Sequence, residues 1–357
     1  MSDTPTTPHA GEELTPRERQ VLEAVVRTYV ETAEPAGSRT VGRRFDLGVS
    51  AATIRNTMSD LEEKGYLLHP HTSAGRVPTD RAYRFYVDRL IQPRPLTSVE
   101  EAELAEALDP GAAYAVEHLV RNATRALSLL SQELGLAVAP RLDEAALEKL
   151  DLLPVSHDSV VMVASIRSGV VRTVYVNLPG EVPRDTLDTV ARILNERLSG
   201  LTLSEIRATL PDRLRDAAPG DDPASGELLN IFMQSAAELM QGSAGGVGDL
   251  HLGQASVLAA QPEFTTGESL VSLLRLTEQR DVLSGALVGR EHPHGLQITI
   301  GSENTSLELA DFTLVTAQYQ VGGLKGVVGV IGPTRMPYEK VIAIVESTSR
   351  LVTRILT

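Results

Sequence analysis

Two adjacent hydrogen-bonding residues, Arg55 and Asn56, lie within the segment SAATIRNTMSDLEEKG, residues 50–65. In the DNA major groove, Arg pairs with guanine and Asn forms two hydrogen bonds with adenine. The nearby Ala52 and Thr53 are small and permit a close approach to the bases. We therefore predict that Thr53, Arg55 and Asn56 contact base edges, with Ala52 beside them.

A second group of polar residues flanks this segment and suits DNA phosphates. Hydroxyl groups, Arg side chains and helix N-termini are common phosphate ligands. The group predicted to contact phosphates at helix starts is Ser38, Arg39, Thr40 and Ser50. A polar loop further along supplies a third group, His71, Thr72, Ser73 and Arg76.

Helices and a hairpin are needed to position these groups. The sequence predicts a short helix from Ser38, as its cap, to about Phe45, and a second helix from Ser50, as its cap, to Lys64. The turn 46–48 separates the two helices, and Gly65 ends the second. Ile54, Met58 and Leu61 recur at helical spacing and form its buried stripe.

The residues around this pair of helices complete a small domain. Thr15-Pro16-Arg17-Glu18 predicts the start of a helix that runs to about Thr32, through a capping box. Residues 66–68 and 76–77 are predicted strands around a polar loop, which together form a wing. Asp80 is the expected cap of an aromatic helix over 81–90. We interpret its rings as packing against the domain or a second copy, the alternative being base stacking.

Five longer motifs stand out: PAGSRTVGRRF, SAATIRNTMSDLEEKGYL, PHTSAGRVPTDRAYRFYVDRL, IGSEN and GVIGPTRMPYEKVI. Together they resemble the HrcA family of heat-inducible transcription repressors. They lie at both ends of the chain in the family's order, and residues 179–261 match no motif. The resemblance implies an N-terminal winged helix-turn-helix domain, then a GAF-like α+β domain interrupted by an inserted dimerisation domain. It also implies that the protein is a homodimer that binds an inverted-repeat operator. The GroE chaperonin is expected to support the activity of this repressor, and heat stress is expected to inactivate it.

The expected domains follow from this resemblance and from the hydrophobic pattern. Five strands are predicted to form one antiparallel sheet, with a helix from 112 to about 134 before it and a helix over 337–356 after it. These strands are 159–166, 170–177, 296–300, 312–320 and 326–331. Helices over 185–198, 204–214 and 226–240 are predicted between the two groups of strands. The predicted division is a disordered tail 1–13, a winged-helix domain 14–92, a linker 93–111, a GAF-like first part 112–179, an insert 180–265 and a GAF-like second part 266–357.

Composition fits a cytoplasmic protein, and its net charge argues against nucleic-acid binding by the whole surface, whereas its uneven charge is compatible with a DNA-binding domain on an acidic regulatory part. The 357-residue chain has no Cys, a formal charge of −14 and 42% hydrophobic residues. It lacks a run of about twenty apolar residues, so no membrane-spanning helix is expected. The acidic N-terminus is unlike a signal peptide. Residues 14–92 hold 12 Lys and Arg against 10 Asp and Glu, a charge of +2, which leaves −16 for the rest.

Other candidate sites have simpler interpretations. Gly322–Gly326 are expected in a hairpin turn, because no GK[ST] motif marks a phosphate loop. Arg335 is expected to bind an acidic neighbour or backbone carbonyls. The pairs His69/His71 and His292/His294 lack zinc-helix spacing. We therefore expect the protein to have no enzymatic activity and to bind no cofactor or metal ion. The alternative function is a regulator whose GAF-like domain senses a small ligand, in a polar pocket between strands 296–300 and 312–320.

Overall fold

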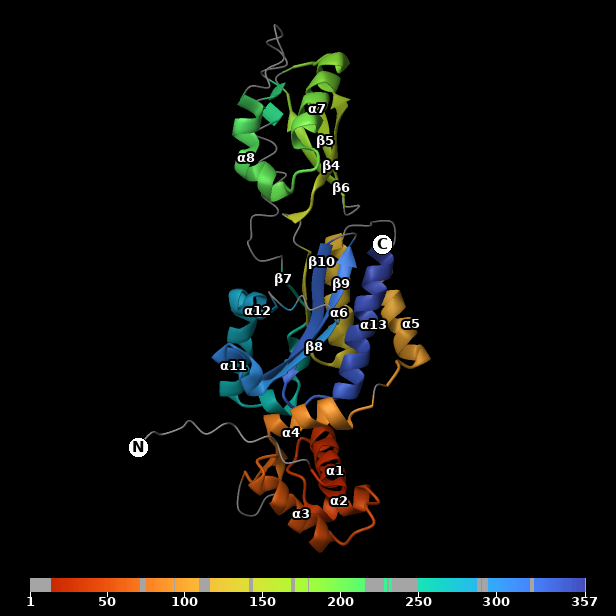
Figure 1. The fold of residues 1–357 in the computed structure, drawn as a ribbon, viewed down its shortest axis with the longest axis vertical. Coiled ribbons are helices and arrows are strands. Elements are labelled where there is room, and N and C mark those ends of the chain that lie inside the picture. Colours follow the sequence, from red (N-terminus) through yellow and green to blue (C-terminus); the bar gives the residue numbers. More distant parts are fainter. Residues whose placement is uncertain are drawn as a thin grey trace, which may run out of the picture.

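The computed structural model describes residues 14–70, 75–92, 94–108, 116–140, 144–167, 171–178, 180–215, 228–229, 231–232, 250–287, 290, 295–321 and 324–356. These residues form three parts stacked along one long axis (Figure 1). We call them the head (14–92), the central body around a five-stranded sheet, and the distal unit around a three-stranded sheet. The expected α+β class is confirmed.

The head begins with helix α1 (Pro16–Thr32), which has the predicted capping box. Thr15 Oγ1 accepts the N–H of Glu18 at 3.3 Å, and the Glu18 carboxylate accepts the N–H of Thr15 at 2.8 Å. Two further helices, α2 (Ser38–Arg44) and α3 (Ala51–Glu63), pack against α1 and against each other. The predicted apolar stripe of α3 is buried in the core that the three helices form.

One predicted cap of this pair is confirmed and the other is wrong. Ser50 Oγ accepts the N–H of Thr53 at 3.1 Å and caps α3. The cap of α2 is Gly37, whereas Ser38 is the first helical residue and makes no capping bond. A glycine cap needs no side-chain bond, so the hydroxyl one residue later gave a misleading signal. Gly65 follows α3 with a φ of +75°, the left-handed conformation that ends many helices.

A short β-ladder forms the base of the predicted wing. Strands β1 (Leu67–Leu68) and β2 (Val77–Pro78) are antiparallel. Ala36, from the loop after α1, extends the ladder by pairing with Arg76, at 2.8 and 3.0 Å between backbone N and O. A Cβ at Gly75 would lie 2.5 Å from the Ala36 backbone, so only glycine permits this approach. Residues 71–74, at the tip, are outside the described residues.

A continuous helical segment, α4 (Asp80–Phe85) and the π-helical turn η1 (Tyr86–Leu90), joins the head to the central body. Thr79 caps it, with its Oγ1 3.3 Å from the N–H of Ala82, so the prediction that Asp80 is the cap is wrong. The interpretation of its rings as packing residues is confirmed. Tyr83 and Tyr86 are buried, and Phe85 meets the ring of Tyr66 edge-on.

The sheet of the central body is antiparallel, with the order β7-β3-β10-β9-β8. Its strands are β7 (Leu250–Leu252), β3 (Leu134–Val138), β10 (Leu324–Pro333), β9 (Phe312–Val321) and β8 (Leu296–Ile300). The last three match predicted strands. The β9–β10 hairpin agrees with the turn expected at Gly322–Gly326, of which residues 322–323 lie outside the described residues.

Helices cover both faces of this sheet (Figure 1). On one face lie α6 (Val116–Ser131) and α13 (Tyr338–Leu356), with α5 (Ser98–Ala107) packed against α6. The other face packs against shorter elements through a second apolar cluster. These elements are α10 (Ser256–Ala259), η3 (Pro262–Phe264), α11 (Gly267–Glu278), α12 (Arg280–Leu287) and η5 (Leu307–Leu309), with the turn η4 (Gly301–Glu303) near the head.

The strands 159–166 and 171–177 do not join this sheet, so their predicted partners are wrong. They are β5 (Ser159–Ile166) and β6 (Val171–Asn177), and they pair with β4 (Leu147–Ser156) in the separate sheet β4-β5-β6 of the distal unit. Helices α7 (Arg184–Leu198) and α8 (Leu203–Arg215) cover one face of it and share its apolar core. The central sheet instead takes β3 and β7, which flank the distal unit in the sequence.

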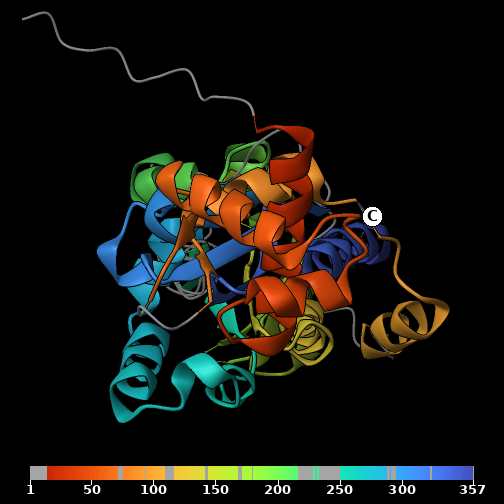
Figure 2. The ribbon, with the colours of Figure 1, turned by 90° about the horizontal axis from the view of Figure 1, so that it is seen from below.

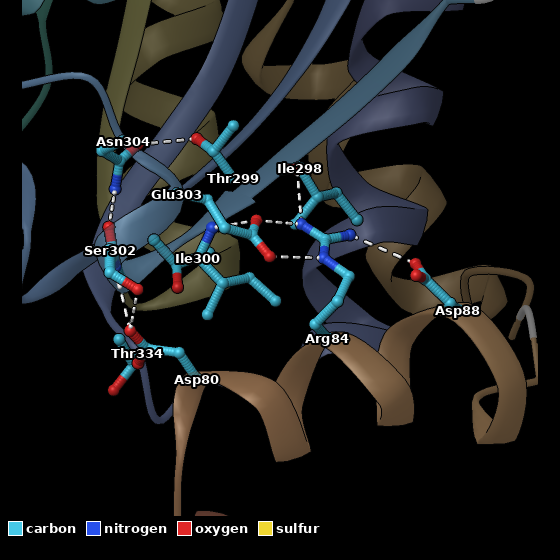
Figure 3. Close-up of polar contacts among 12 residues, drawn as sticks. Asp80, Arg84, Asp88, Ile298, Thr299, Ile300, Ser302, Glu303, Asn304 and Thr334 are labelled. Carbon is cyan, nitrogen blue, oxygen red and sulfur yellow. Dashed lines mark hydrogen bonds and ion pairs between the residues drawn. The ribbon is translucent and has the colours of Figure 1, made fainter. Parts of the chain in front are cut away.

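Polar contacts fix the head on the central body. Arg84 and Asp80 of α4 contact β8 and the turn η4 (Figure 3). On a second side, Arg335 binds both carboxylate oxygens of Glu263 and donates to the backbone carbonyl of Val30 in α1, at 2.6 Å. The expectation that Arg335 satisfies an acidic neighbour and a carbonyl is confirmed.

Candidate nucleic-acid interface

Helix α3 lies at the end of the head that points away from the central body (Figure 1). Its stripe of Ile54, Met58 and Leu61 is at most 3% exposed, because it packs into the head. Arg55 and Asn56 lie off this stripe and are exposed. The amphipathic pattern of α3 therefore leaves one Arg and one Asn side by side on an accessible surface.

The start of α3 organises the other two predicted residues of this helix. Ala52 is exposed, and Thr53 is half-buried. The hydroxyls of Ser50 and Thr53 lie 2.9 Å apart, and Ser50 also accepts the N–H of Thr53. The cap uses one of the backbone N–H groups in the first turn of α3. The other N–H groups of a first turn have no partner within the helix and can bind a phosphate oxygen.

Helix α2 brings the remaining helix-start residues to the same end of the molecule. Arg39 and Thr40 are exposed, and Ser38 is half-buried. Arg43, in the last turn of α2, is exposed as well, and we had not singled it out from the sequence. Arg43 lies one helical turn after Arg39 and Thr40, and this spacing would have placed it on the same face of α2. Viewed from the head end, these helices lie in front of the central body (Figure 2).

Arg76 stands apart from this exposed group. Its Nη2 lies 2.7 Å from Glu62 Oε2 in α3, and its side chain is 17% exposed. The ion pair ties the base of the wing to the last turns of α3. The other three predicted wing residues, His71, Thr72 and Ser73, lie outside the described residues.

Other basic residues of the head serve its internal structure. Lys64 Nζ lies 2.9 Å from Glu18, Arg44 pairs with Glu31, and the Arg27 guanidinium lies over the Phe45 ring at 5.7 Å. Burial raises the pKa of Glu18, but hydrogen bonds from Lys64 and Thr15 outweigh it and hold this pKa below its ordinary value. The charges of Lys64 and Arg44 are thus partly neutralised by carboxylates of the head.

The junction residues Asp80, Arg84 and Glu303 were missed by sequence reasoning. Arg84 and Glu303 are 219 residues apart, so no local spacing links them. A weak signal existed in IGSEN, whose Gly301 adopts a φ of +52° close to the Asp80 carboxylate. A Cβ at Gly301 would lie 2.2 Å from Asp80 Oδ2, which explains the glycine.

Among the described helices, none is long and apolar enough to cross a membrane, and the described residues contain no cluster of three or more His, Cys, Asp or Glu side chains that would hold a metal ion.

Comparison with known proteins gives consistent matches along most of the chain. The family model described as "HrcA protein C terminal domain" matches residues 117–342. The "Heat-inducible transcription repressor HrcA" of Chlorobium chlorochromatii (strain CaD3) is 38% identical over 335 residues, which cover 93% of this chain and 94% of that protein. The protein of the same name from Chlorobium phaeobacteroides (strain BS1) is 39% identical, over 93% and 96% of the two chains.

A solved structure shares the fold. The crystal structure of a protein described as hypothetical matches with a TM-score of 0.66 and 23% identity, over 97% of this chain and 99% of that one. The overall fold described above therefore occurs in an experimental structure as well.

Proposed function

Because the chain belongs to the HrcA family of heat-inducible transcription repressors, we propose that it represses transcription by placing α3 in the major groove of an operator. The regulated genes are heat-shock genes, on which the protein acts as a negative regulator. The observation that carries the proposal is the exposed pair Arg55 and Asn56 on a helix whose opposite face is buried. Together with the β1–β2 ladder, the three helices of the head make a winged helix-turn-helix domain.

The individual contacts follow from the positions of the side chains. Thr53, Arg55 and Asn56 contact base edges, and Ala52 allows α3 to approach them. Phosphates are bound at the starts of α2 and α3 and along the wing. The phosphate-binding group is Ser38, Arg39, Thr40, Ser50, His71, Thr72 and Ser73. Arg76 is also proposed to contact phosphate, from the base of the wing, where its ion pair with Glu62 positions it.

We propose that two copies bind an inverted repeat and that the distal unit joins them. The uncovered face of its sheet carries four large apolar side chains that are 50–70% exposed: Leu153, Val155, Val171 and Tyr175. Such a patch on a soluble domain marks an interface, and a second copy of the same sheet matches it by two-fold symmetry. We therefore propose an inserted dimerisation domain over about residues 144–232, in place of the 180–265 predicted from the sequence, because β4, β5 and β6 form the distal sheet and β7 joins the central one. The GAF-like body then comprises 116–140 and 250–356.

The heat response is proposed to depend on the GroE chaperonin, which keeps the repressor folded and able to bind DNA in the cytoplasm. Heat would occupy the chaperonin with unfolded clients and lower the active fraction of the repressor. The packing of the GAF-like sheet supports this route over ligand sensing between β8 and β9. Leu314, Val315 and Ala317 of β9 are at most 3% exposed, so side chains fill this region.

The test is a gel-shift titration at one fixed salt concentration, since the affinity of DNA-binding proteins depends steeply on salt. The DNA is an inverted repeat from upstream of a chaperone operon, with its single half-site as the control. We expect tight binding to the full repeat only, and a larger active fraction after incubation with chaperonin and ATP. Equal affinity for both DNAs would contradict the dimer, and no gain with chaperonin would contradict the proposed heat response.

A further inference from the structure

A cavity of about 330 Å³ lies at the junction of the head and the central body. The head contributes Tyr29 of α1, Pro78 of β2 and Tyr83 of α4 to its walls. Residues of η3, α11 and the segments next to β9 and β10 supply the opposite side. Voids larger than a water molecule are few in protein interiors, whereas ligand sites begin at about 300 Å³. The size of this cavity is therefore that of a small-molecule site.

The apolar part of the cavity is aromatic. The rings of Phe264 and Phe312 stack with their centroids 6.1 Å apart and their planes at 17°. Tyr29 and Tyr83 also line the cavity, from the head. Aromatic walls of this kind favour a flat apolar group or a cation, because their faces carry negative electrostatic potential.

The polar groups of the cavity discriminate between charges. Arg335 lines it, but its guanidinium already binds Glu263 through two nitrogens and the Val30 carbonyl through the third. An anionic ligand would therefore have to displace Glu263. Asp311, also a lining residue, is exposed and has no hydrogen bond or ion pair with any part of the chain that the structure describes. The cavity thus offers an available carboxylate and no available cation from Arg335.

A buried hydroxyl group completes the site. Tyr83 is 1% exposed, and its hydroxyl has no hydrogen-bond partner among the described residues. Burial raises the pKa of Tyr83 well above its ordinary value, so the hydroxyl remains neutral. A buried polar group without a partner is costly, and the hydroxyl oxygen can accept an N–H of a ligand ammonium group in the cavity.

We propose that this cavity binds a small organic cation with an aromatic or apolar body, whose ammonium group pairs with Asp311 and whose ring packs against Phe264 and Phe312. Its walls belong to both the head and the central body, so the bound cation holds the two parts together. This site involves neither DNA nor chaperonin and goes beyond the function proposed above.

The experiment measures direct binding to the full-length protein by ligand-observed NMR. The probes are benzylammonium, benzyl alcohol and benzoate, which share one ring and differ in charge. The blocking variant is Ser272→Phe, because Ser272 of α11 lines the cavity and is exposed, so a large side chain can enter without disrupting a core. Its matched control is Val271→Phe on the same helix, at a residue that is 47% exposed and outside the cavity lining.

We expect saturable binding of benzylammonium, with a Kd on the order of 1 mM for a fragment of this size, and weaker binding of the other two probes. Ser272→Phe should abolish this binding and Val271→Phe should not. Asp311→Asn should weaken it at least about threefold, with Asp281→Asn, an exposed residue of α12, as its control. No saturable binding, equal binding of all three probes, or binding that survives Ser272→Phe would overturn the proposal. None of these results depends on operator binding.

Discussion

Arg84 Nε donates a hydrogen bond to Glu303 Oε1 at 2.8 Å, which joins the head to the turn η4 of the central body. A second nitrogen of Arg84 reaches the other carboxylate oxygen and also donates to the Ile298 carbonyl, at 2.8 Å (Figure 3). Beside this pair, Asp80 accepts the N–H and the hydroxyl of Ser302, each at 2.9 Å. A bidentate ion pair therefore helps to join the head to the central body, far from the proposed DNA-contacting end of the head.

Replacing Arg84 should loosen this junction. Arg84→Ala removes the bidentate contact, but both side chains are about one-third exposed, so we expect a loss of only about 1 kcal/mol. The measurement is hydrogen exchange of the amides of α4 and η4, which should become faster. The control is Arg89→Ala, at an exposed residue of η1. Unchanged protection in Arg84→Ala would show that the remaining contacts of the junction hold the head without the Arg84–Glu303 pair.

The same pair should make stability depend on pH. Burial raises the pKa of Glu303, but the hydrogen bonds from Arg84 and the Ile300 N–H and the Arg84 charge outweigh it, so the pKa lies below its ordinary value. The contribution is complete above the ordinary pKa and is lost as the pH falls through the lowered value. The stability difference between the wild type and Glu303→Gln should therefore shrink on acidification, as measured by urea unfolding at several pH values. A difference that is constant with pH would contradict the ion pair's role.

Glu133 should show the opposite dependence. It is 2% exposed, and burial raises its pKa well above its ordinary value, although a hydrogen bond from Gln261 opposes this. Protonation therefore accompanies folding, and stability is lost as the pH rises through the raised pKa. Glu133→Gln should raise the melting temperature at pH 8 more than at pH 5. An equal change at both pH values would mean that the carboxyl group stays in one protonation state.

The base of the wing should tolerate no side chain at Gly75. Gly75→Ala places a Cβ 2.5 Å from the Ala36 backbone and should break the pairing of Ala36 with Arg76. We expect a cost of about 1–3 kcal/mol in the head and a loss of operator affinity. The control is Gly285→Ala, because a Cβ at Gly285 meets no atom within 4 Å. Operator titrations and circular dichroism separate lost binding from global unfolding, and equal affinity in both variants would refute the steric argument.

Sequence reasoning succeeded where the determining residues lie within a few positions of one another. The capping box of Thr15 and Glu18, the Ser50 cap and the buried stripe of α3 were all predicted, because each depends on spacing within one or two helical turns. The same reasoning assigned the cap of α4 to Asp80, whereas the cap is the neighbouring Thr79, whose hydroxyl is equally suitable.

Long-range partners could not be predicted in this way. Strand β5 has clear alternation, but alternation does not show that its partner is β4 and not β9. Strand β3 is buried at all five positions and β4 contains charged residues and a proline, so neither shows the usual strand pattern. The contacts of Arg84 and Arg335 with the opposite part of the protein likewise required the fold.

The most direct test of the proposed DNA interface is the affinity of Arg55→Ala for the proposed inverted-repeat operator and for a scrambled duplex, at the same salt concentration. If Arg55 contacts a base edge, the variant should lose about 1–3 kcal/mol of operator affinity, roughly five- to 150-fold, and little affinity for the scrambled DNA. Arg89→Ala, the control from η1, should behave as the wild type. An unchanged ratio of the two affinities in Arg55→Ala would contradict the central claim that α3 recognises the operator.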